Sequence, residues 1–546
     1  MRTLGINAAY HDCSACLVQD GRVIAAAEEE RFTRIKHGKR PVPFTTWQLP
    51  FHAIDYCLQE AGIPLAEVQH VAYSYAPALL LGAYADDATI QLPLEPSRHA
   101  SERSSPWEPL FLSYLVNAPR QLAGGAPHHL QASLRMAPHE QPYQWHFVEH
   151  HLAHEASAFL ASPCETAAVL TLDGRGELAT ISYGLFKEGQ YQRLKQVNLP
   201  HSLGLLYEEV TRHLGFLHAS DEYKVMALAS FGTPRYAPIF QDIVQYRQHG
   251  DVEIMRVDWE KLFGPARERG AALTEHHMDI ARSLQYVLED TVLKMAGWLH
   301  RETGAGQLCM AGGVALNCVM NAMLRDHGPF SDVWVQPAAG DAGTALGAAL
   351  WIDHRHRATH ERVWRMEHAF LGPAFHDSDI EAFLRQSKLR YRRVANIAEA
   401  SAELLAQNKV LGWFQGRMEF GPRALGARSI LASPIDAAMQ GRLNQIKDRE
   451  DFRPVAPVVP EEDAADWFEN AGVAPFMTFV YNVAPDKIAR IPAVRHIDGT
   501  ARVQTISRAQ HPLYHEVVRA FGQRTGVPVL INTSFNTRGE PIVCTP

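Results

Sequence analysis

The feature that most constrains the fold is a unit of strand, polar loop and hairpin that occurs twice along the chain. The first copy has a short apolar strand at residues 4–7, a polar loop at 10–12, and hairpin strands at 14–18 and 22–26. The second copy has a buried-strand pattern at 167–172, a Gly-rich loop at 173–177, and hairpin strands at 179–186 and 190–197. Asp20-Gly21 and Glu188-Gly189 supply the two-residue turns that such hairpins favour.

Two facing units of this kind are how proteins of the actin, sugar-kinase and Hsp70 class hold nucleotide phosphates across a cleft. The alternative is an α/β protein with unrelated hairpins, since Asp-Gly turns are common in all such proteins. The repeat therefore predicts an α/β fold with a duplicated core, and it leaves that alternative open.

A histidine-rich helix lies between the two units, in the segment Glu149-His150-His151-Leu152-Ala153-His154. His150 and His154 are four residues apart, so on a helix both imidazoles point to one side and can bind one metal ion. His151 is rotated by about 100° and is not expected to share that ion. The zinc-protease pattern needs a Glu directly after the first His, where this chain has His151, so the spacing predicts a metal site of another kind.

Two glycine-rich turns follow apolar strands further along the chain. Residues 308–317 run from a strand into Gly312-Gly313, and residues 337–347 place Asp341 among small residues at a helix start. Such turns let the backbone come close to a nucleotide, although a Gly-Gly pair alone is a weak signal. Asp341 is either a helix cap or a functional carboxylate. The residues expected at the nucleotide are Gly174, Gly176, Gly312, Gly313 and Asn317.

A change of composition near residues 355–375 predicts a domain boundary, with one domain at 1–355 and a second at 370–546. In the second domain we expect helices within 377–388 and 397–408 and strands at 389–394 and 410–414. Two segments there, 416–429 and 444–454, combine arginine and lysine with Gly, Pro and Phe. Arginine suits phosphate oxygens, so these segments favour anion binding in fixed loops over a structural ion-pair network.

Composition limits the classes of function. The 546 residues are enough for two or three domains, and the formal net charge of −8 argues against sequence-independent nucleic-acid binding. The seven cysteines are scattered, which fits a reduced, cytoplasmic setting. No apolar run approaches about 18 residues, and the first residues lack a signal-peptide pattern. Residues 76–142 form a less regular insert, either a lid or a helical decoration.

The motifs together resemble one family. His11-Asp12, Glu28 to His37, the histidine helix, Leu172-Asp173-Gly174-Arg175-Gly176-Glu177, Glu222 to Met226, the two glycine turns, Phe420 to Leu431, and Asn532 to Asn536 occur in this order. In this order the chain resembles the NodU/CmcH-type O-carbamoyltransferases over nearly its whole length, with the 76–142 insert least typical. The resemblance implies a Kae1-like domain of the actin/Hsp70 class followed by a YrdC-like α/β domain. It also implies that ATP and carbamoyl phosphate form a carbamoyl-adenylate, from which the carbamoyl group passes to a hydroxyl.

The resemblance assigns roles by motif. It implies an iron(II)-type centre, or another divalent metal, held by His150, His154, Asp173 and Asp341. His11 would be the general base, Asp12 would orient it, and Lys36 would lie near the transferred group. Without the family, His11 would be taken for an ordinary loop histidine. The residues implied at carbamoyl phosphate are Arg423, Lys447, Arg453, Arg502, Asn532 and Ser534, the last two with a structural turn as the alternative.

The expected acceptor is a small-molecule natural product or sugar, which places the protein in secondary metabolism. We expect no nucleic-acid or membrane partner, and a homodimer remains open. The alternatives are threonylcarbamoyl transfer to tRNA and a non-catalytic Hsp70-like nucleotide switch. The acidic net charge disfavours the first, and the paired histidines are unnecessary for the second. Family members usually continue beyond the segment that ends here at Pro546, so either the sequence is trimmed or this member is short.

Overall fold

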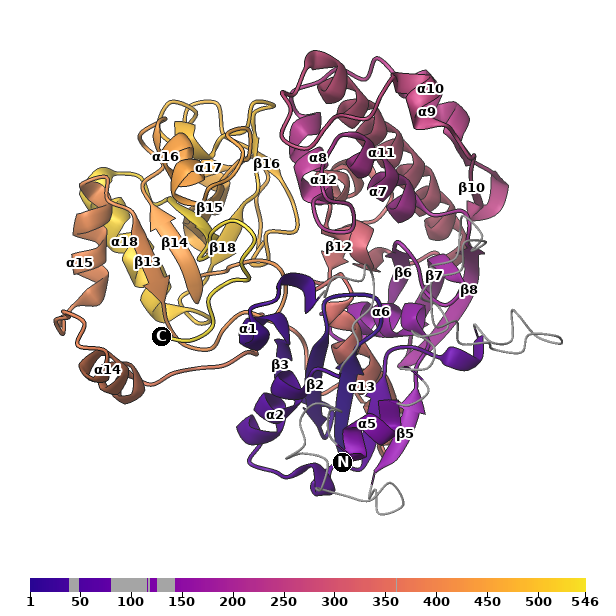
Figure 1. Cartoon of the computed structure of the whole chain (residues 1–546), viewed down its shortest axis with the longest axis horizontal. Helices are drawn as coiled ribbons and strands as arrows, with labels where there is room; N and C mark the ends of the chain where they lie inside the picture. The colour runs from indigo at the N-terminus through magenta and orange to yellow at the C-terminus, as the bar shows by residue number, and fades with distance from the viewer. Residues whose placement is uncertain (39–48, 80–114, 116–117, 125–142, 360) are drawn as a thin grey trace.

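The computed structural model describes residues 1–38, 49–79, 115, 118–124, 143–359 and 361–546. Most of the insert predicted at 76–142 therefore lies outside the described residues. Three five-stranded sheets organise the described part of the chain, and each lies in its own lobe (Figure 1).

The first sheet is built around the predicted amino-terminal unit. Its strands are β1 (Arg2–Asn7), β2 (Ser14–Gln19), β3 (Arg22–Glu28), β4 (His70–Tyr73) and β5 (Gln144–Phe147). They lie in the order β3-β2-β1-β4-β5, with antiparallel pairs in the hairpin and parallel pairs beyond β1. Its helices are α1 (Glu30–Thr33), α2 (Phe51–Glu60), α5 (Ala118–Gly124) and α13 (Ala342–His356).

The second sheet repeats this topology. Its strands are β6 (Ala167–Leu172), β7 (Ala179–Lys187), β8 (Gln190–Asn198), β11 (Gln307–Ala311) and β12 (Asp332–Val335). Their order is β8-β7-β6-β11-β12, again antiparallel in the hairpin and parallel beyond its first strand. Both hairpin turns have positive φ, at Asp20-Gly21 and Glu188-Gly189, as a two-residue turn requires. The predicted duplication and its actin-class α/β topology are confirmed.

Helices of the second lobe cover this sheet. They are α6 (His150–Phe159), α7 (Leu203–His213), α8 (Glu222–Ala229), α9 (Ala237–Ile243), α10 (Trp259–Phe263), α11 (Glu275–Thr303) and α12 (Cys318–His327). Leu284, Leu288 and Val292 of α11 are buried at helical spacing against the sheet. A small hairpin of β9 (Val244–Tyr246) and β10 (Val252–Ile254) completes the lobe.

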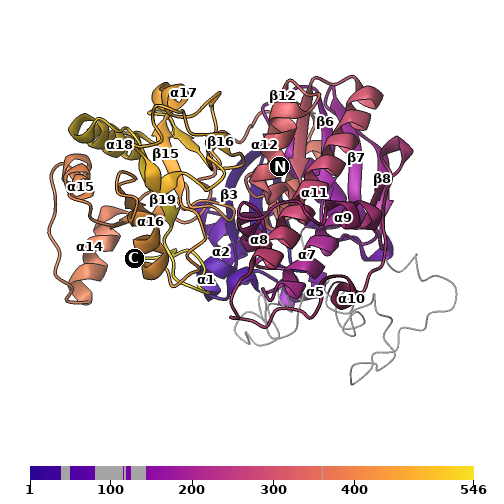
Figure 2. The ribbon, with the colours of Figure 1, turned by 90° about the horizontal axis from the view of Figure 1, so that it is seen from above.

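The third lobe is the carboxy-terminal α/β part. Its sheet contains β13 (Leu411–Phe414), β14 (Arg428–Ala432), β19 (Leu530–Ser534), β15 (Ala456–Pro460) and β18 (Gln504–Ile506), in this order. Its helices are α14 (Asp377–Gln386), α15 (Ile397–Ala406), α16 (Met439–Ile446), α17 (Ala464–Trp467) and α18 (Pro512–Thr525). A minor pair, β16 (Tyr481–Asn482) and β17 (Thr500–Ala501), lies outside this sheet. Seen from above, α14 lies at the outer edge of the lobe (Figure 2).

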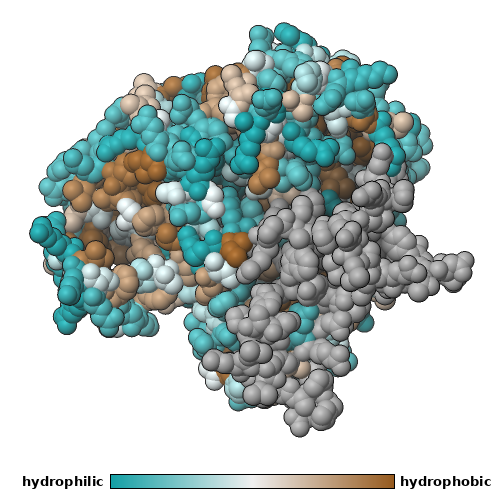
Figure 3. Space-filling model, in the orientation of Figure 1, coloured by the Kyte–Doolittle hydropathy of each residue, from teal (hydrophilic) through white to brown (hydrophobic). Residues whose placement is uncertain are grey.

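The strand predicted at 389–394 is wrong. This segment is irregular, and Leu389 and Tyr391 are 55% and 44% exposed. Its alternation of apolar residues with arginine fits one face of a strand, but among the described residues no neighbouring strand pairs with it. Helix α14 likewise contains no buried residue, and apolar surface is visible over this lobe in Figure 3.

The cysteines are free and buried, all seven of them. Cys13 and Cys16 have the C-x-x-C spacing, so the expectation that all the cysteines are scattered is wrong for this pair. Cys16 lies in β2 and Cys13 just before it, and residues three apart on an extended chain point to opposite faces. None of the helices in the described part of the chain has the length and apolar character needed to span a bilayer.

Candidate active site

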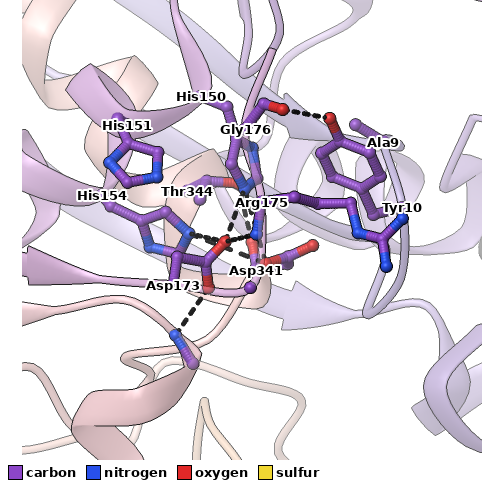
Figure 4. Close-up of polar contacts among 12 residues, drawn as sticks. Ala9, Tyr10, His150, His151, His154, Asp173, Arg175, Gly176, Asp341 and Thr344 are labelled. Atoms are coloured by element: carbon purple, nitrogen blue, oxygen red, sulfur yellow. Dashed lines mark hydrogen bonds and ion pairs between the residues drawn. The ribbon is translucent and has the colours of Figure 1, made fainter. Parts of the chain in front are cut away.

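Two histidines and two aspartates converge where the first two lobes meet (Figure 4). His150 and His154 lie on the first turns of α6, Asp173 follows β6, and Asp341 precedes α13. Asp341 Oδ1 lies 3.5 Å from His150 Nε2 and 3.6 Å from His154 Nε2. Asp173 Oδ2 lies 3.7 and 3.9 Å from the same two nitrogens. One ligand atom from each residue lies within 4.8 Å of all the others, so one ion can contact all four.

Neighbouring groups fix the orientation of these ligands. Glu177 accepts hydrogen bonds from the His150 backbone N–H at 3.0 and 3.1 Å, which anchors the start of α6. His150 Nδ1 donates to the Ser74 carbonyl at 3.2 Å, so Nε2 is the nitrogen left for a metal. The Gly313 N–H donates to Asp173 Oδ1 at 2.7 Å. Each contact comes from a different part of the chain, so the fold itself assembles the cluster.

Close helix packing brings Asp341 to the histidines. A side chain at Gly347 of α13 would place its Cβ 1.8 Å from the Ala153 carbonyl of α6. Only glycine permits that approach. The Asp341 side chain makes no capping hydrogen bond to α13. The cap alternative is therefore wrong, and the carboxylate faces the histidines instead.

The donor atoms fit a divalent metal. His150 Nε2, His154 Nε2 and Asp341 Oδ2 are buried and have no hydrogen-bond partner among the described residues. Burial lowers the pKa of His150, but Asp341 and Asp173 outweigh it and raise that pKa well above its usual value. Burial likewise raises the pKa of Asp341, but His11 and His150 outweigh it and lower the pKa to about 2. Two nitrogens and two carboxylates suit a divalent transition metal such as iron(II). His151 points elsewhere, with Nδ1 2.9 Å from Ser182 Oγ.

A hydrogen-bonded chain runs beside this cluster. His11 Nδ1 lies 2.9 Å from Asp12 Oδ2 and 3.7 Å from Asp341 Oδ2. Asp12 Oδ1 lies 2.9 Å from His37 Nδ1, and His37 Nε2 lies 3.0 Å from Ser220 Oγ. Burial raises the pKa of Asp12, yet His37 and His11 hold it well below its usual range. Asp12 is therefore a carboxylate that orients two imidazoles, one of them the predicted base.

Cations gather on the facing wall, which the third lobe supplies. They are Arg423, Lys447, Arg449, Arg453 and Arg502. Burial and then Arg502 lower the pKa of Arg423 to about 9, and burial and then Arg453 lower that of Arg449 to about 9. Burial, followed by Arg449, Arg453 and Lys36, lowers the pKa of Lys447 to about 6. Cations that destabilise one another in this way would be stabilised by a bound anion.

One cavity of about 1230 Å³ joins the two sets of groups. Its wall includes His11, Asp12, Lys36, Asp173 and Asp341 from the first two lobes and the five cations from the third. Asn532 and Ser534 lie on the same wall. Asn532 Nδ2 donates to Gln504 Oε1 at 2.6 Å, which fits the structural alternative, and its role in binding stays a prediction. The fold and the cavity define an α/β protein with one cavity between a candidate metal centre and a cationic wall.

The predicted nucleotide residues divide into two groups. Gly174, Gly313 and Asn317 line the cavity, whereas Gly176 and Gly312 do not. Gly312 has φ +93°, and a Cβ there would lie 2.1 Å from the Leu172 carbonyl. Its glycine is required by backbone packing, and a nucleotide role for the five residues stays a prediction. Of the four candidate metal ligands, Asp173 and Asp341 line the cavity, whereas His150 and His154 lie behind its wall.

Several cavity residues were not assigned a role from the sequence. Arg449 lies in the segment at 444–454 for which anion binding was predicted, but it was not among the residues assigned to carbamoyl phosphate. His37 directly follows Lys36, and Tyr223 lies in the motif at 222–226, where its ring contacts the Arg453 guanidinium at 4.7 Å. For Arg449, the available signal was its short basic segment, in which basic residues alternate with Pro and aromatic residues.

Known proteins match the chain along most of its length. The carbamoyltransferase N-terminus family model matches residues 2–84 and 130–350, and the carbamoyltransferase C-terminus model matches residues 402–546. The chain therefore belongs to the carbamoyltransferase family, and it is a carbamoyltransferase by class. This assignment excludes the non-catalytic nucleotide switch.

Individual relatives agree with the family models. Nodulation protein NolNO of Sinorhizobium fredii is 39% identical, covering 98% of this chain and 76% of that protein. Nodulation protein NolO of Bradyrhizobium diazoefficiens is 41% identical, covering 72% and 74%. The uncharacterized protein sll1178 of Synechocystis sp. is 39% identical, covering 100% and 92%. Among solved structures, the match to HypF of T. kodakarensis covers 64% of this chain and 47% of the HypF chain, at 14% identity. Its TM-score of 0.34 is too low to support a conclusion about fold or function.

Proposed function

We propose that this carbamoyltransferase makes carbamoyl-adenylate and transfers its carbamoyl group to a hydroxyl of a small-molecule natural product or sugar. In the first step carbamoyl phosphate, ATP and water give carbamoyl-adenylate, pyrophosphate and phosphate. In the second, the acceptor hydroxyl attacks the carbamoyl carbon and AMP leaves. The observation that carries this proposal is the single cavity that holds both the cationic wall and the His11–Asp12 pair.

The cationic wall fits the first step, because both substrates are polyanions. Arg423, Arg449 and Arg502 are partly buried cations that an incoming phosphate group would stabilise. Glu450 is an acidic side chain on the same wall, and Lys224 holds it at 2.9 Å. A net positive wall of this kind binds and orients phosphate groups, and the bound anion in turn relieves the repulsion between the cations.

The His and Asp cluster fits a metal that acts on the nucleotide. We propose that His150, His154, Asp173 and Asp341 hold a divalent ion, iron(II) by family resemblance. Such an ion would offset negative charge on phosphate oxygens when bound. Asp173 and Asp341 reach the cavity wall, so the ion would lie beside the ligand rather than in a sealed structural site.

His11 is the proposed general base of the second step. Asp12 accepts from Nδ1 and so favours the tautomer whose Nε2 carries the lone pair. That nitrogen takes the hydroxyl proton while the new C–O bond forms. Lys36 lies on the same wall, where its charge suits a phosphate or carbamate oxygen. We propose a small-molecule acceptor without nucleic acid, because the chain is acidic overall and one cluster of its basic groups lines the cavity. A membrane partner is not part of the proposal, and the homodimer and the cytoplasmic location stay predictions.

The test is the product balance. The protein is incubated with α-labelled ATP and labelled carbamoyl phosphate, against a panel of sugars, hydroxylated natural products and bulk tRNA. We expect AMP, pyrophosphate and phosphate to appear in equal amounts with a carbamoylated small molecule. ADP as the nucleotide product would contradict the adenylate route. Label transferred to tRNA instead would contradict the small-molecule acceptor.

A further inference from the structure

The loop that carries His11 has a strained backbone. Tyr10 and Asp12, the residues on either side of His11, both lie in the left-handed region, with φ of +47° and +51°. Residues other than glycine rarely adopt this conformation, and a bulky tyrosine does so only where surrounding contacts compensate. Strained backbone of this kind occurs most often at functional sites, so the contacts that hold this loop bear on the chemistry of His11.

Within the first lobe, the buried side chain of Asn7 holds this loop. Its amide Nδ2 donates to the carbonyls of His11 and Asp12, at 3.0 Å each. The Asp12 N–H donates to the His37 carbonyl at 2.9 Å. These bonds fix the loop to β1 and to His37, but they do not fix it to the second lobe.

Tyr10 connects the loop to the second lobe (Figure 4). Its hydroxyl donates to the Gly176 carbonyl at 2.8 Å. Gly176 lies in the loop between β6 and β7, which is the counterpart, in the second repeated unit, of the loop between β1 and β2 that carries His11. The hydrogen bond therefore joins the equivalent loops of the two units, one with the proposed base and one with Asp173.

The ring of Tyr10 packs against the candidate metal centre. Its centroid lies 5.3 Å from that of His150, with an angle of 83° between the rings, and 5.7 Å from that of Tyr75, at 72°. Such edge-to-face arrangements are favourable for aromatic rings. Tyr10 also lines the cavity. Its ring therefore contacts one candidate metal ligand, while its hydroxyl holds the loop that carries another.

We propose that Tyr10 is a positioning residue, whose hydroxyl fixes the loop of His11 against the loop of Asp173 for the carbamoyl-transfer step. This inference rests on the proposed function, in which His11 takes the proton of the acceptor hydroxyl. That step needs the base on the first loop and the carbamoyl donor beside the second loop at a defined separation. A displacement of about 1 Å between reacting groups can cost about 100-fold in rate.

Loss of the hydroxyl alone would let the two loops move apart. Gly176 is buried, so its carbonyl would lose this donor without gaining bulk water, and an unpaired buried carbonyl favours a shift of its loop. Asp173 would move less, because the Gly313 N–H donates to its carboxylate at 2.7 Å. The base should therefore be displaced from the second loop while the candidate metal centre stays in place.

The first test measures the contact between the loops. Hydrogen–deuterium exchange of the whole chain is followed by mass spectrometry for wild type and for Tyr10→Phe, which keeps the ring. We expect faster exchange in Tyr10→Phe in the peptides that cover residues 8–13 and 174–177. Unchanged exchange there would overturn the proposal, whatever reaction the protein catalyses.

Tyr183→Phe is the matched control. The Tyr183 hydroxyl also donates to a glycine carbonyl, that of Gly250 at 2.7 Å, and its ring also packs edge-on to an aromatic ring, that of Trp298. Tyr183 is not among the residues that line the cavity. This control should leave the exchange of both peptides and the rate of carbamoyl transfer unchanged.

The second test asks whether Tyr10 acts through His11. Rates of carbamoyl transfer are compared for wild type, Tyr10→Phe, His11→Asn and the double variant. We expect Tyr10→Phe to lower the transfer rate about tenfold in the wild-type protein but by less than about twofold beside His11→Asn, where no base is left to position. Formation of carbamoyl-adenylate by Tyr10→Phe should stay within about threefold of wild type.

Two kinetic results would overturn the proposal. One is an equal loss of transfer in both backgrounds, which indicates a structural role, and the other is a wild-type transfer rate in Tyr10→Phe. Full transfer by His11→Asn would contradict the base role and with it the role of Tyr10, even where exchange shows that Tyr10 joins the loops. Absence of carbamoyl-adenylate in wild type would contradict only the adenylate route, and the comparison of transfer rates would still decide the role of Tyr10.

Discussion

Lys447 gives the cationic wall a pH dependence that can be measured with a simple anion. Its ammonium donates to the Asn536 carbonyl at 2.8 Å and to Asn536 Oδ1 at 2.9 Å, and to Ser534 as well. Burial and the neighbouring cations nevertheless hold its pKa at about 6. Without ligand, most Lys447 side chains are therefore neutral at pH 8. A bound dianion restores the charge, because the attraction raises the pKa again.

The expected magnitude comes from proton linkage. If binding needs the protonated amine, the dissociation constant increases by a factor equal to the reciprocal of the protonated fraction of Lys447. With a pKa of about 6, that factor is about 2 at pH 6 and about 100 at pH 8, so affinity falls about 50-fold, or about 2.3 kcal/mol. Between these pH values the affinity weakens as pH rises. At pH 8 about one proton is taken up for each anion bound.

Sulfate is the probe, since its charge is constant over this range. Calorimetry at pH 6 and 8, in two buffers of different ionisation enthalpy, gives both the affinity and the proton uptake. Lys447→Met should bind sulfate weakly with little pH dependence, and the exposed Lys409→Met should behave as wild type. A flat wild-type affinity without proton uptake would refute the reasoning. So would a pH dependence that survives in Lys447→Met, because cavity histidines would then be its source.

Three further predictions concern separate parts of the site. Asp341→Asn removes a carboxylate that faces both candidate metal histidines, so metal affinity should fall at least about tenfold in a chelator competition. The exposed Asp242→Asn is the control and should leave the affinity unchanged. Unchanged affinity in Asp341→Asn would remove Asp341 from the ligand set. His37→Asn keeps a donor at the Nδ1 position that faces Asp12, so carbamoyl transfer to the acceptor should stay within about threefold of wild type. His37→Gln keeps only the hydrogen bond to Ser220, and its kcat should fall about tenfold. The reverse order of the two variants would show that His37 only supports the loop that carries Ser220. Glu419→Gln weakens three backbone hydrogen bonds that hold the turn at 425–428, so the free energy of unfolding in denaturant should fall by about 2–3 kcal/mol. A fall no larger than that of the exposed control Glu403→Gln would contradict this role.

The duplicated core could be predicted because its signals are local. Each hairpin is specified by a two-residue turn at Asp20-Gly21 or Glu188-Gly189 and by flanking apolar residues, and both form as expected. The strand predicted at 389–394 failed for the opposite reason. Its alternating pattern satisfies a strand locally, but a strand needs a partner, and the pattern contains no information about one.

The site shows the same division between local and tertiary information. The pairing of His150 with His154 follows from helix spacing, whereas the choice between cap and ligand for Asp341 depends on the approach of α13 to α6. A glycine that lines a cavity and one that packs against backbone look alike in sequence, which is why Gly312 was grouped with Gly313. His37 was passed over because neither the direction of a loop side chain nor its partners can be derived from neighbouring residues.

Direct detection of the intermediate tests the central claim that one cavity makes and consumes carbamoyl-adenylate. Single-turnover reactions with labelled carbamoyl phosphate and ATP are quenched and separated, for wild type, His11→Asn and Arg423→Met. With an acceptor present, carbamoyl-adenylate should accumulate in His11→Asn, since its formation does not need the base, and should be absent in Arg423→Met. Carbamoyl transfer at the wild-type rate by His11→Asn, or transfer without any adenylate or pyrophosphate, would contradict the account.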